Sequence, residues 1–115
     1  MLTLYQAEWC PFSSAVRERL TELGIDFVAR QVAPWPEQRS QLLAHTGTDQ
    51  TPVLETDDGE FHQGTRAIFA YLEPVEATPY AAGHRRRYYE HRPARERDIA
   101  GVILERATPM SGARA

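Results

Sequence analysis

A strand pattern, a helix pattern and a second strand pattern follow one another within residues 1–32. Residues 2–5 (Leu-Thr-Leu-Tyr) are apolar and partly β-branched, which is typical of a strand. Four apolar side chains then recur at helical spacing, which predicts one buried helix face. They are Phe12, Val16, Leu20 and Leu23. Residues 25–32 again resemble a strand. This strand–helix–strand order predicts two parallel strands joined by a right-handed crossover.

The only cysteine, Cys10, falls between the first strand and the helix. Pro11 suits the first helical position, where its missing N–H is not needed. The free N–H groups and the dipole of a helix N-terminus stabilise a thiolate, and Ser13 is near enough in sequence to donate a further hydrogen bond. We therefore expect a lowered Cys10 pKa and a reactive thiol. The alternative is a small buried hydrophobe, the usual role of a lone cysteine, and we expect this junction to be a poor place to bury one.

The middle of the chain predicts a second helix and then a hairpin. A polar helix over residues 37–45 begins after Pro36, with Leu42 and Leu43 as its expected sheet contacts. Two short strands, residues 53–56 and 60–63, flank the hairpin turn Asp57-Asp58-Gly59.

A third helix, residues 66–73, follows with Thr65 as its expected N-cap. The predicted order is β-α-β-α-β-β-α, complete by about residue 73. Residues 74–80 resemble a linker, and helices are expected over residues 81–92 and 93–106. We therefore divide the chain into a domain at 1–73 and a linker with a helical, Arg-rich extension at 74–115.

Length and composition favour a single small soluble domain. The chain has 115 residues, no apolar run long enough to span a bilayer, and no signal-peptide pattern at its N-terminus. One cysteine cannot form an internal disulfide, so any disulfide must be intermolecular, and a cytoplasmic location is expected. Residues 1–80 carry five arginines and twelve acidic residues, whereas residues 81–115 carry eight arginines and four acidic residues.

Four motifs in order give the chain a family likeness over residues 1–73. They are Cys10-Pro11-Phe12-Ser13, Thr46-Gly47 followed by Thr51-Pro52-Val53, Asp58-Gly59, and Gly64-Thr65-Arg66. The chain resembles a monothiol glutaredoxin of the thioredoxin-fold superfamily, and it is similar to the N-terminal domain of cysteine-type glutathione transferases. The resemblance implies a three-layer α/β/α fold with a four-stranded mixed sheet, three strands parallel and the last antiparallel. It also implies a cis peptide before Pro52.

The resemblance assigns a role to each candidate site residue. The catalytic set is Cys10, Pro11 and Ser13. The set that binds a low-molecular-weight thiol is Trp9, Phe12, Arg39, Thr51, Pro52, Gly64, Thr65 and Arg66. For Arg39, a solvated helix face is an equally good interpretation. The implied co-substrate is glutathione or an analogue such as mycothiol or bacillithiol, and no metal is expected.

Two positions depart from the glutaredoxin pattern. Ala7 stands where the family usually has a lysine three residues before the cysteine, and Arg66 replaces the usual acidic contact at the start of the third helix. The transferases' Glu-Ser pair is replaced by Gly64-Thr65. We do not expect the full helical second domain of the transferases in this chain. These changes leave the identity of the small thiol open.

The leading hypothesis is a thiol–disulfide oxidoreductase in which Cys10 reduces mixed disulfides between client proteins and a small thiol. The alternatives are a glutathione transferase-like activity, an iron–sulfur carrier, and a non-catalytic adaptor. Pro11 disfavours the carrier because the cluster-binding relatives have glycine there. The expected protein is a monomer or weak homodimer without membrane contacts. Nucleic acid is an unlikely partner, although the positive charge of the Arg-rich extension could attract an acidic binding partner.

Overall fold

The structure is a computed structural model that describes residues 1–91. The β-α-β-α-β-β-α order is confirmed, with one short 3₁₀ turn added before the second helix. The elements are β1 (Leu2–Gln6), α1 (Pro11–Glu22), β2 (Phe27–Gln31), η1 (Pro36–Gln38), α2 (Ser40–Thr46), β3 (Val53–Glu55), β4 (Phe61–Gln63) and α3 (Thr65–Leu72). The predicted 93–106 helix lies outside the described residues.

The four strands form one mixed sheet in the order β2-β1-β3-β4. β1 and β2 are parallel, as the strand–helix–strand pattern predicts, with Leu4 opposite Ala29. β3 is antiparallel to β1 and to β4, and Leu4 also lies opposite Leu54. The expectation that the last strand would be the antiparallel one is therefore wrong. The reversed strand is β3, and the hairpin then turns β4 back into the direction of β1 and β2.

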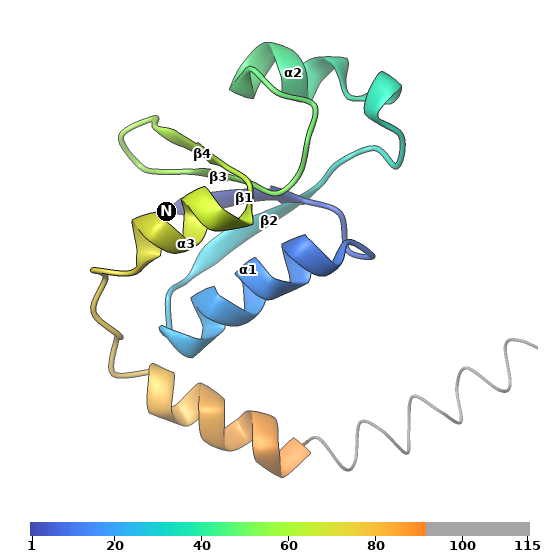
Figure 1. Cartoon of the computed structure of the whole chain (residues 1–115). Coiled ribbons are helices and arrows are strands. Elements are labelled where there is room, and N and C mark those ends of the chain that lie inside the picture. The colour runs from blue at the N-terminus through green and yellow to red at the C-terminus, as the bar shows by residue number, and fades with distance from the viewer. Residues whose placement is uncertain (92–115) are drawn as a thin grey trace, which may run out of the picture. The chain divides into compact units, whose positions relative to one another are not determined.

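The sheet lies between two layers of helices, which confirms the three-layer thioredoxin-like fold. Figure 1 shows α1 and α3 side by side on one face of the sheet and α2 on the other. The core lies on the α1–α3 side, where Leu4 and Leu54 of the sheet are fully buried against Leu20, Ile68 and Leu72 of the two helices. Burial of such side chains supplies most of the stability of a small domain.

The buried face of α1 differs from the predicted one in its first turn. Val16, Leu20 and Leu23 are buried as expected, but Phe12 is 62% exposed and Ser13 is fully buried. The helix turns Ser13 inward because its side chain bonds to the loop that precedes Cys10. Phe12 is thereby directed to solvent.

The second helical segment is interrupted at Arg39. Pro36 begins η1 as predicted, but the backbone of Arg39 leaves the helical region (φ −100°, ψ 37°) before α2 begins. Leu42 and Leu43 were both expected to contact the sheet. Leu42 is buried, but Leu43 is 50% exposed, so the prediction for Leu43 is wrong. A helix of two turns on an exposed sheet face buries only its innermost side chains.

Residues 74–82 pack with the first compact unit, Met1–Ala82, rather than forming a free linker. The Thr78 N–H donates to the Leu23 carbonyl at 2.8 Å, and the Thr78 hydroxyl donates to the Gly24 carbonyl at 2.8 Å. Gly24 has φ +69°, and a Cβ there would approach the Ala81 backbone nitrogen to 2.7 Å. Glycine is therefore required at this close approach.

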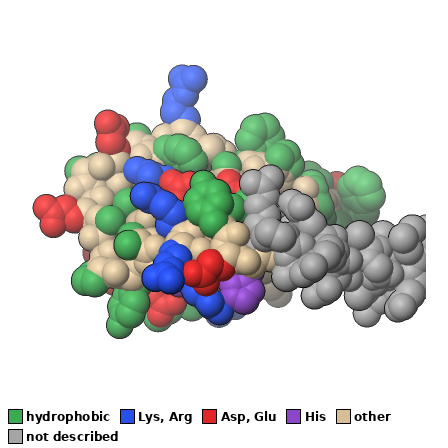
Figure 2. Space-filling view, turned by 90° about the horizontal axis from the view of Figure 1, so that it is seen from below, with side chains coloured by type: hydrophobic (Ala, Val, Ile, Leu, Met, Phe, Trp, Pro, Cys, Tyr) green, Lys and Arg blue, Asp and Glu red, His purple; other side chains and the backbone are tan. Residues whose placement is uncertain are grey.

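A further helix covers residues 81–91, as predicted, and most of it belongs to a second unit that begins at Gly83. Arg86 and Arg87 both pair with Glu90, at 2.7 and 2.9 Å. Figure 2 shows acidic, basic and histidine side chains interspersed on one face of the molecule rather than a patch of a single sign. Among residues 1–91, no helix is long and apolar enough to cross a bilayer.

Candidate functional site

Cys10 is the N-cap residue of α1, with an extended backbone (φ −79°, ψ 123°) that turns the chain from β1 into the helix. Its N–H donates to the Ala7 carbonyl at 3.0 Å, and its own carbonyl accepts from the Ser14 N–H at 3.0 Å. These bonds close the turn on one side and start the helix on the other. Pro11 occupies the first helical position, as predicted.

The thiol of Cys10 lies among hydrogen-bond donors. Burial raises the pKa of Cys10, but the Ser13 N–H and hydroxyl, the Phe12 N–H and the Thr51 hydroxyl outweigh it, and the net pKa is lowered. The predicted direction is therefore confirmed. The expectation that this junction is a poor place for burial is wrong, because Cys10 is only 7% exposed. The thiol is recessed, and its donors stabilise the thiolate within that recess.

The loop before β3 brings Thr51 to the thiol. The Thr51–Pro52 peptide is cis, which confirms the expectation from the family likeness, and Pro52 is fully buried. The Gly64 N–H donates to the Pro52 carbonyl at 2.9 Å, and the Gln63 side-chain amide donates to Thr48 Oγ1 at 2.9 Å. The loop is thus fixed to β4 and to the start of α3.

The start of α3 differs in detail from the prediction. Gly64, not Thr65, is the N-cap residue, and no side chain caps the helix. Gly64 has φ +86°, a conformation that favours glycine. Thr65 is the first helical residue, so the first N–H groups of α3 have no intrahelical acceptors and are available to an anion.

Arg39 has a structural role. Its side chain is almost fully buried, and its guanidinium donates to the carbonyls of Ala33 (2.7 Å), Asp49 (2.9 Å) and Pro34 (3.2 Å). These bonds join the β2–η1 connection to the loop that leads to Thr51. The expectation of an exposed helix face is wrong, and we leave Arg39 out of the proposed thiol site.

The remaining candidate residues differ in where they lie relative to the Cys10 thiol. Trp9 and Phe12 flank the recessed thiol in sequence and are 64% and 62% exposed. Arg66 is exposed and lines a groove with Arg19 and Glu22 of α1. The structure thus brings Ser13, Phe12 and Thr51 to the Cys10 thiol. Arg66 instead lies in the groove between α1 and α3.

A model of the glutathione S-transferase N-terminal domain matches residues 4–79. The chain belongs to this family. A search of curated proteins found no match. Among solved structures, a glutathione S-transferase from Rhodospirillum rubrum is 31% identical, with a TM-score of 0.58 over 69% of this chain and 36% of that one.

Two further structures of this fold were solved with glutathione. A Methylobacillus flagellatus glutathione S-transferase is 29% identical, with a TM-score of 0.57, and the match covers 69% of this chain and 38% of that one. Glutaredoxin 2 of Salmonella typhimurium is 19% identical, with a TM-score of 0.59 over 69% of this chain and 35% of that one, which shows the shared fold alone. The chain therefore spans less than two fifths of the length of these relatives.

One polar network of this glutathione S-transferase N-terminal domain was missed by the sequence interpretation. Gln6 is almost fully buried at the end of β1, accepts from Arg17 of α1 and donates to the Gln31 side-chain oxygen at 3.3 Å. The same Gln31 oxygen accepts from the Glu8 N–H at 3.0 Å, and Arg17 pairs with Glu8 at 3.3 Å. The network holds the turn that presents Cys10. Its one sequence signal is a pair of glutamines at the carboxyl ends of two adjacent parallel strands.

Replacing Ser13 with alanine should raise the Cys10 pKa, because the thiolate loses its hydroxyl donor. The thiolate fraction at neutral pH then falls, and we expect iodoacetamide to alkylate Cys10 about fivefold more slowly, since higher basicity offsets part of the loss. The pH profile of alkylation in the parent protein should have its midpoint below that of a cysteine-containing peptide. In Ser13→Ala this midpoint should move upward.

The matched control is Ser14→Ala, which removes the neighbouring hydroxyl from the same helix turn. Ser14 contributes only its backbone N–H to the Cys10 turn, so its variant should keep the parent pH profile. Equal profiles for Ser13→Ala and the parent would show that the Ser13 hydroxyl does not stabilise the thiolate. Folding is checked by circular dichroism, because Ser13 Oγ also accepts from the Ala7 N–H at 3.3 Å.

Proposed function

We propose that this domain binds glutathione and uses the Cys10 thiolate for thiol–disulfide exchange. The observation that carries the proposal is the recessed thiol with its converging donors, which lower the Cys10 pKa. The glutathione-bound relatives favour glutathione over mycothiol or bacillithiol as the small thiol. No second cysteine exists in the chain, so the reaction takes a monothiol course.

The exchange proceeds in two balanced steps. The Cys10 thiolate attacks the glutathione sulfur of a mixed disulfide, a new Cys10–glutathione disulfide forms, and the client thiolate leaves with the electron pair. The thiolate of a second glutathione molecule then attacks the glutathione sulfur of the Cys10–glutathione disulfide. Oxidised glutathione is released and the Cys10 thiolate returns. Each step reduces one disulfide and forms another, and the electrons come from glutathione.

The residues around Cys10 supply binding and orientation in this proposal. The backbone of Thr51, in the loop that Gly64 and Gln63 hold, offers an edge to the extended glutathione chain. The N–H groups of Thr65 and Arg66 at the start of α3 have no intrahelical acceptors and suit a glutathione carboxylate. Trp9 and Phe12 offer exposed aromatic surface beside the sulfur. Ser13 and Thr51 stabilise the thiolate as attacking and as leaving group.

Intact mass measurement after incubation with oxidised glutathione tests the proposal. We expect one glutathione adduct per chain on Cys10, which free glutathione removes. Parallel incubation with the disulfides of other small thiols shows whether glutathione is preferred. Absence of an adduct with every disulfide would overturn the exchange reaction.

A transferase-like reaction is the second candidate, and the family match favours it equally because the relatives are named glutathione transferases. In this reaction the domain would promote attack of glutathione on a small electrophile. Conjugation of glutathione to an aryl halide, followed by absorbance, separates the two candidates. Conjugation without turnover of a mixed disulfide would favour the transferase.

A further inference from the structure

An open pocket of about 850 Å³ lies between the sheet and α2, on the face opposite α1 and α3. Its sheet side is formed by Tyr5 of β1, Arg30 of β2 and Glu55 of β3. Its helix side includes Leu42 and His45 of α2. Cys10 is not among the lining residues, so this pocket is separate from the proposed thiol site.

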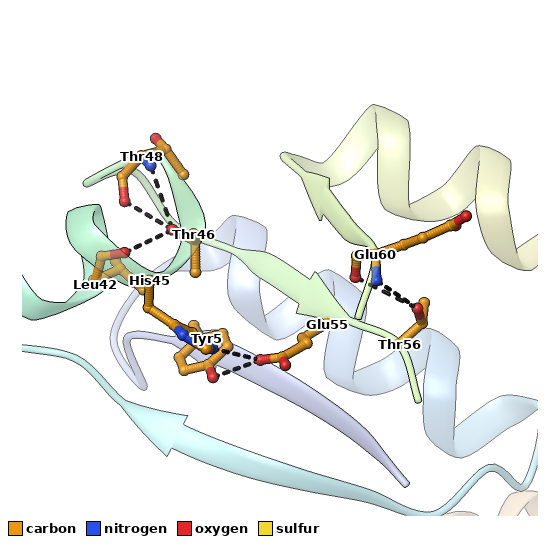
Figure 3. A network of polar contacts seen from close by, with 8 residues as sticks. All are labelled: Tyr5, Leu42, His45, Thr46, Thr48, Glu55, Thr56 and Glu60. Atoms are coloured by element: carbon orange, nitrogen blue, oxygen red, sulfur yellow. Dashed lines mark hydrogen bonds and ion pairs between the residues drawn. The ribbon is translucent and has the colours of Figure 1, made fainter. Parts of the chain in front are cut away.

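The Glu55 carboxylate is held in place by two donors on one oxygen. The Tyr5 hydroxyl donates to Oε1 at 2.7 Å, and His45 Nε2 contacts the same oxygen at 2.9 Å, as Figure 3 shows. The Tyr5 hydroxyl and then His45 hold the Glu55 pKa below its usual value, so Glu55 is a carboxylate at neutral pH. Within residues 1–91, the second oxygen, Oε2, has no hydrogen-bond partner.

Arg30 supplies the opposite charge without pairing to Glu55. The register places Arg30 opposite Tyr5 on one side of β1 and Glu55 opposite Thr3 on the other, with all three strands contributing to the same face. In the described part of the chain, no carboxylate lies within the 4.0 Å of an ion pair with Arg30. The pocket thus presents a guanidinium and a fixed carboxylate from strands two spacings apart and offset by two residues, which places their backbones roughly 12 Å apart.

We propose that this pocket binds a small zwitterion of the amino-acid type, its carboxylate on the Arg30 guanidinium and its ammonium on Glu55 Oε2. A guanidinium pairs with a carboxylate through two parallel hydrogen bonds, and an ammonium donates to a carboxylate oxygen. The Tyr5 ring and Leu42 flank the carbon chain between the two charges. A simple anion would be repelled by Glu55 and a simple cation by Arg30, so both charges are required. The strand spacing favours an ω-amino acid over an α-amino acid.

Titration of the full ¹⁵N-labelled chain with 4-aminobutyrate, followed by two-dimensional NMR, tests the site. We expect saturable shifts at Tyr5, Arg30 and His45 with a dissociation constant in the millimolar range. Butyrate and butylamine carry one charge each on the same carbon chain, and both should bind at least about tenfold more weakly. Equal binding of either analogue would overturn the proposal, as would the absence of saturable shifts.

Variants separate the pocket from other binding modes. Arg30→Gln and Glu55→Gln should each weaken 4-aminobutyrate binding at least about tenfold. Arg30 is exposed, so its variant should keep the parent fold. Arg19→Gln makes the same charge change on α1, across the sheet, and should bind as the parent does. Unchanged binding in Arg30→Gln, or shifts centred on Cys10, would refute the site.

Discussion

Cys10→Ser should reduce mixed-disulfide turnover to the uncatalysed rate. A serine hydroxyl cannot form the Cys10–glutathione disulfide, and the chain has no other thiol to replace it. The loss is therefore complete rather than partial. Turnover is measured by coupling the release of oxidised glutathione to NADPH consumption through glutathione reductase, with a glutathionylated peptide as substrate.

The variant also separates the two candidate functions. Serine is nearly isosteric with cysteine, so the Ala7 and Ser14 backbone bonds should persist and the melting temperature should be unchanged. If Cys10→Ser loses disulfide turnover but still conjugates glutathione to an aryl halide, a hydroxyl at this position or at Ser13 activates glutathione and the transferase reaction is favoured. Residual disulfide turnover would overturn the assignment of Cys10.

Among the variants proposed here, Leu54→Ala should cause the largest loss in the free energy of unfolding. Leu54 is fully buried in β3 and belongs to the core cluster that the sheet forms with α1 and α3. Deletion of a buried leucine side chain costs its transfer free energy and leaves a cavity, so we expect the free energy of unfolding to fall by about 3 kcal/mol. This is a large part of the roughly 5–15 kcal/mol typical of a domain.

Urea denaturation followed by circular dichroism gives both the midpoint and the slope of the transition. The midpoint should fall while the slope stays close to the parent value, because the surface exposed on unfolding is nearly unchanged. Leu43→Ala removes the same side chain from a half-exposed position on α2 and should cost less than about 1 kcal/mol. Similar losses for both variants would contradict the assigned core.

Local sequence patterns predicted most of the elements because each depends on neighbouring residues. The spacing of Val16, Leu20 and Leu23 placed α1, and Asp58-Gly59 placed the hairpin. The direction of β3 depends on where the α2–β3 loop carries the chain, and spacing in the sequence does not contain that information. The family likeness supplied the cis peptide, but the antiparallel strand was assigned one position too late.

The sequence likewise predicted only those parts of the candidate site that depend on neighbouring residues. The position of Cys10 at a helix N-terminus fixed the direction of its pKa shift. The contacts of Arg39 could not be read from the sequence, because its three carbonyl acceptors come from two loops separated along the chain. The Gln6 network was missed because it joins residues from β1, β2 and α1.

The two hydrogen bonds of Thr78 decide where this domain can be joined to another protein. A fragment that stopped at residue 73 would leave the Leu23 and Gly24 carbonyls without these partners at the end of α1. Each intramolecular hydrogen bond contributes about 0.5–1.5 kcal/mol to stability, and this fragment would lose both. Residues 74–82 are therefore part of the transferable module, and a fusion or domain exchange belongs after Ala82.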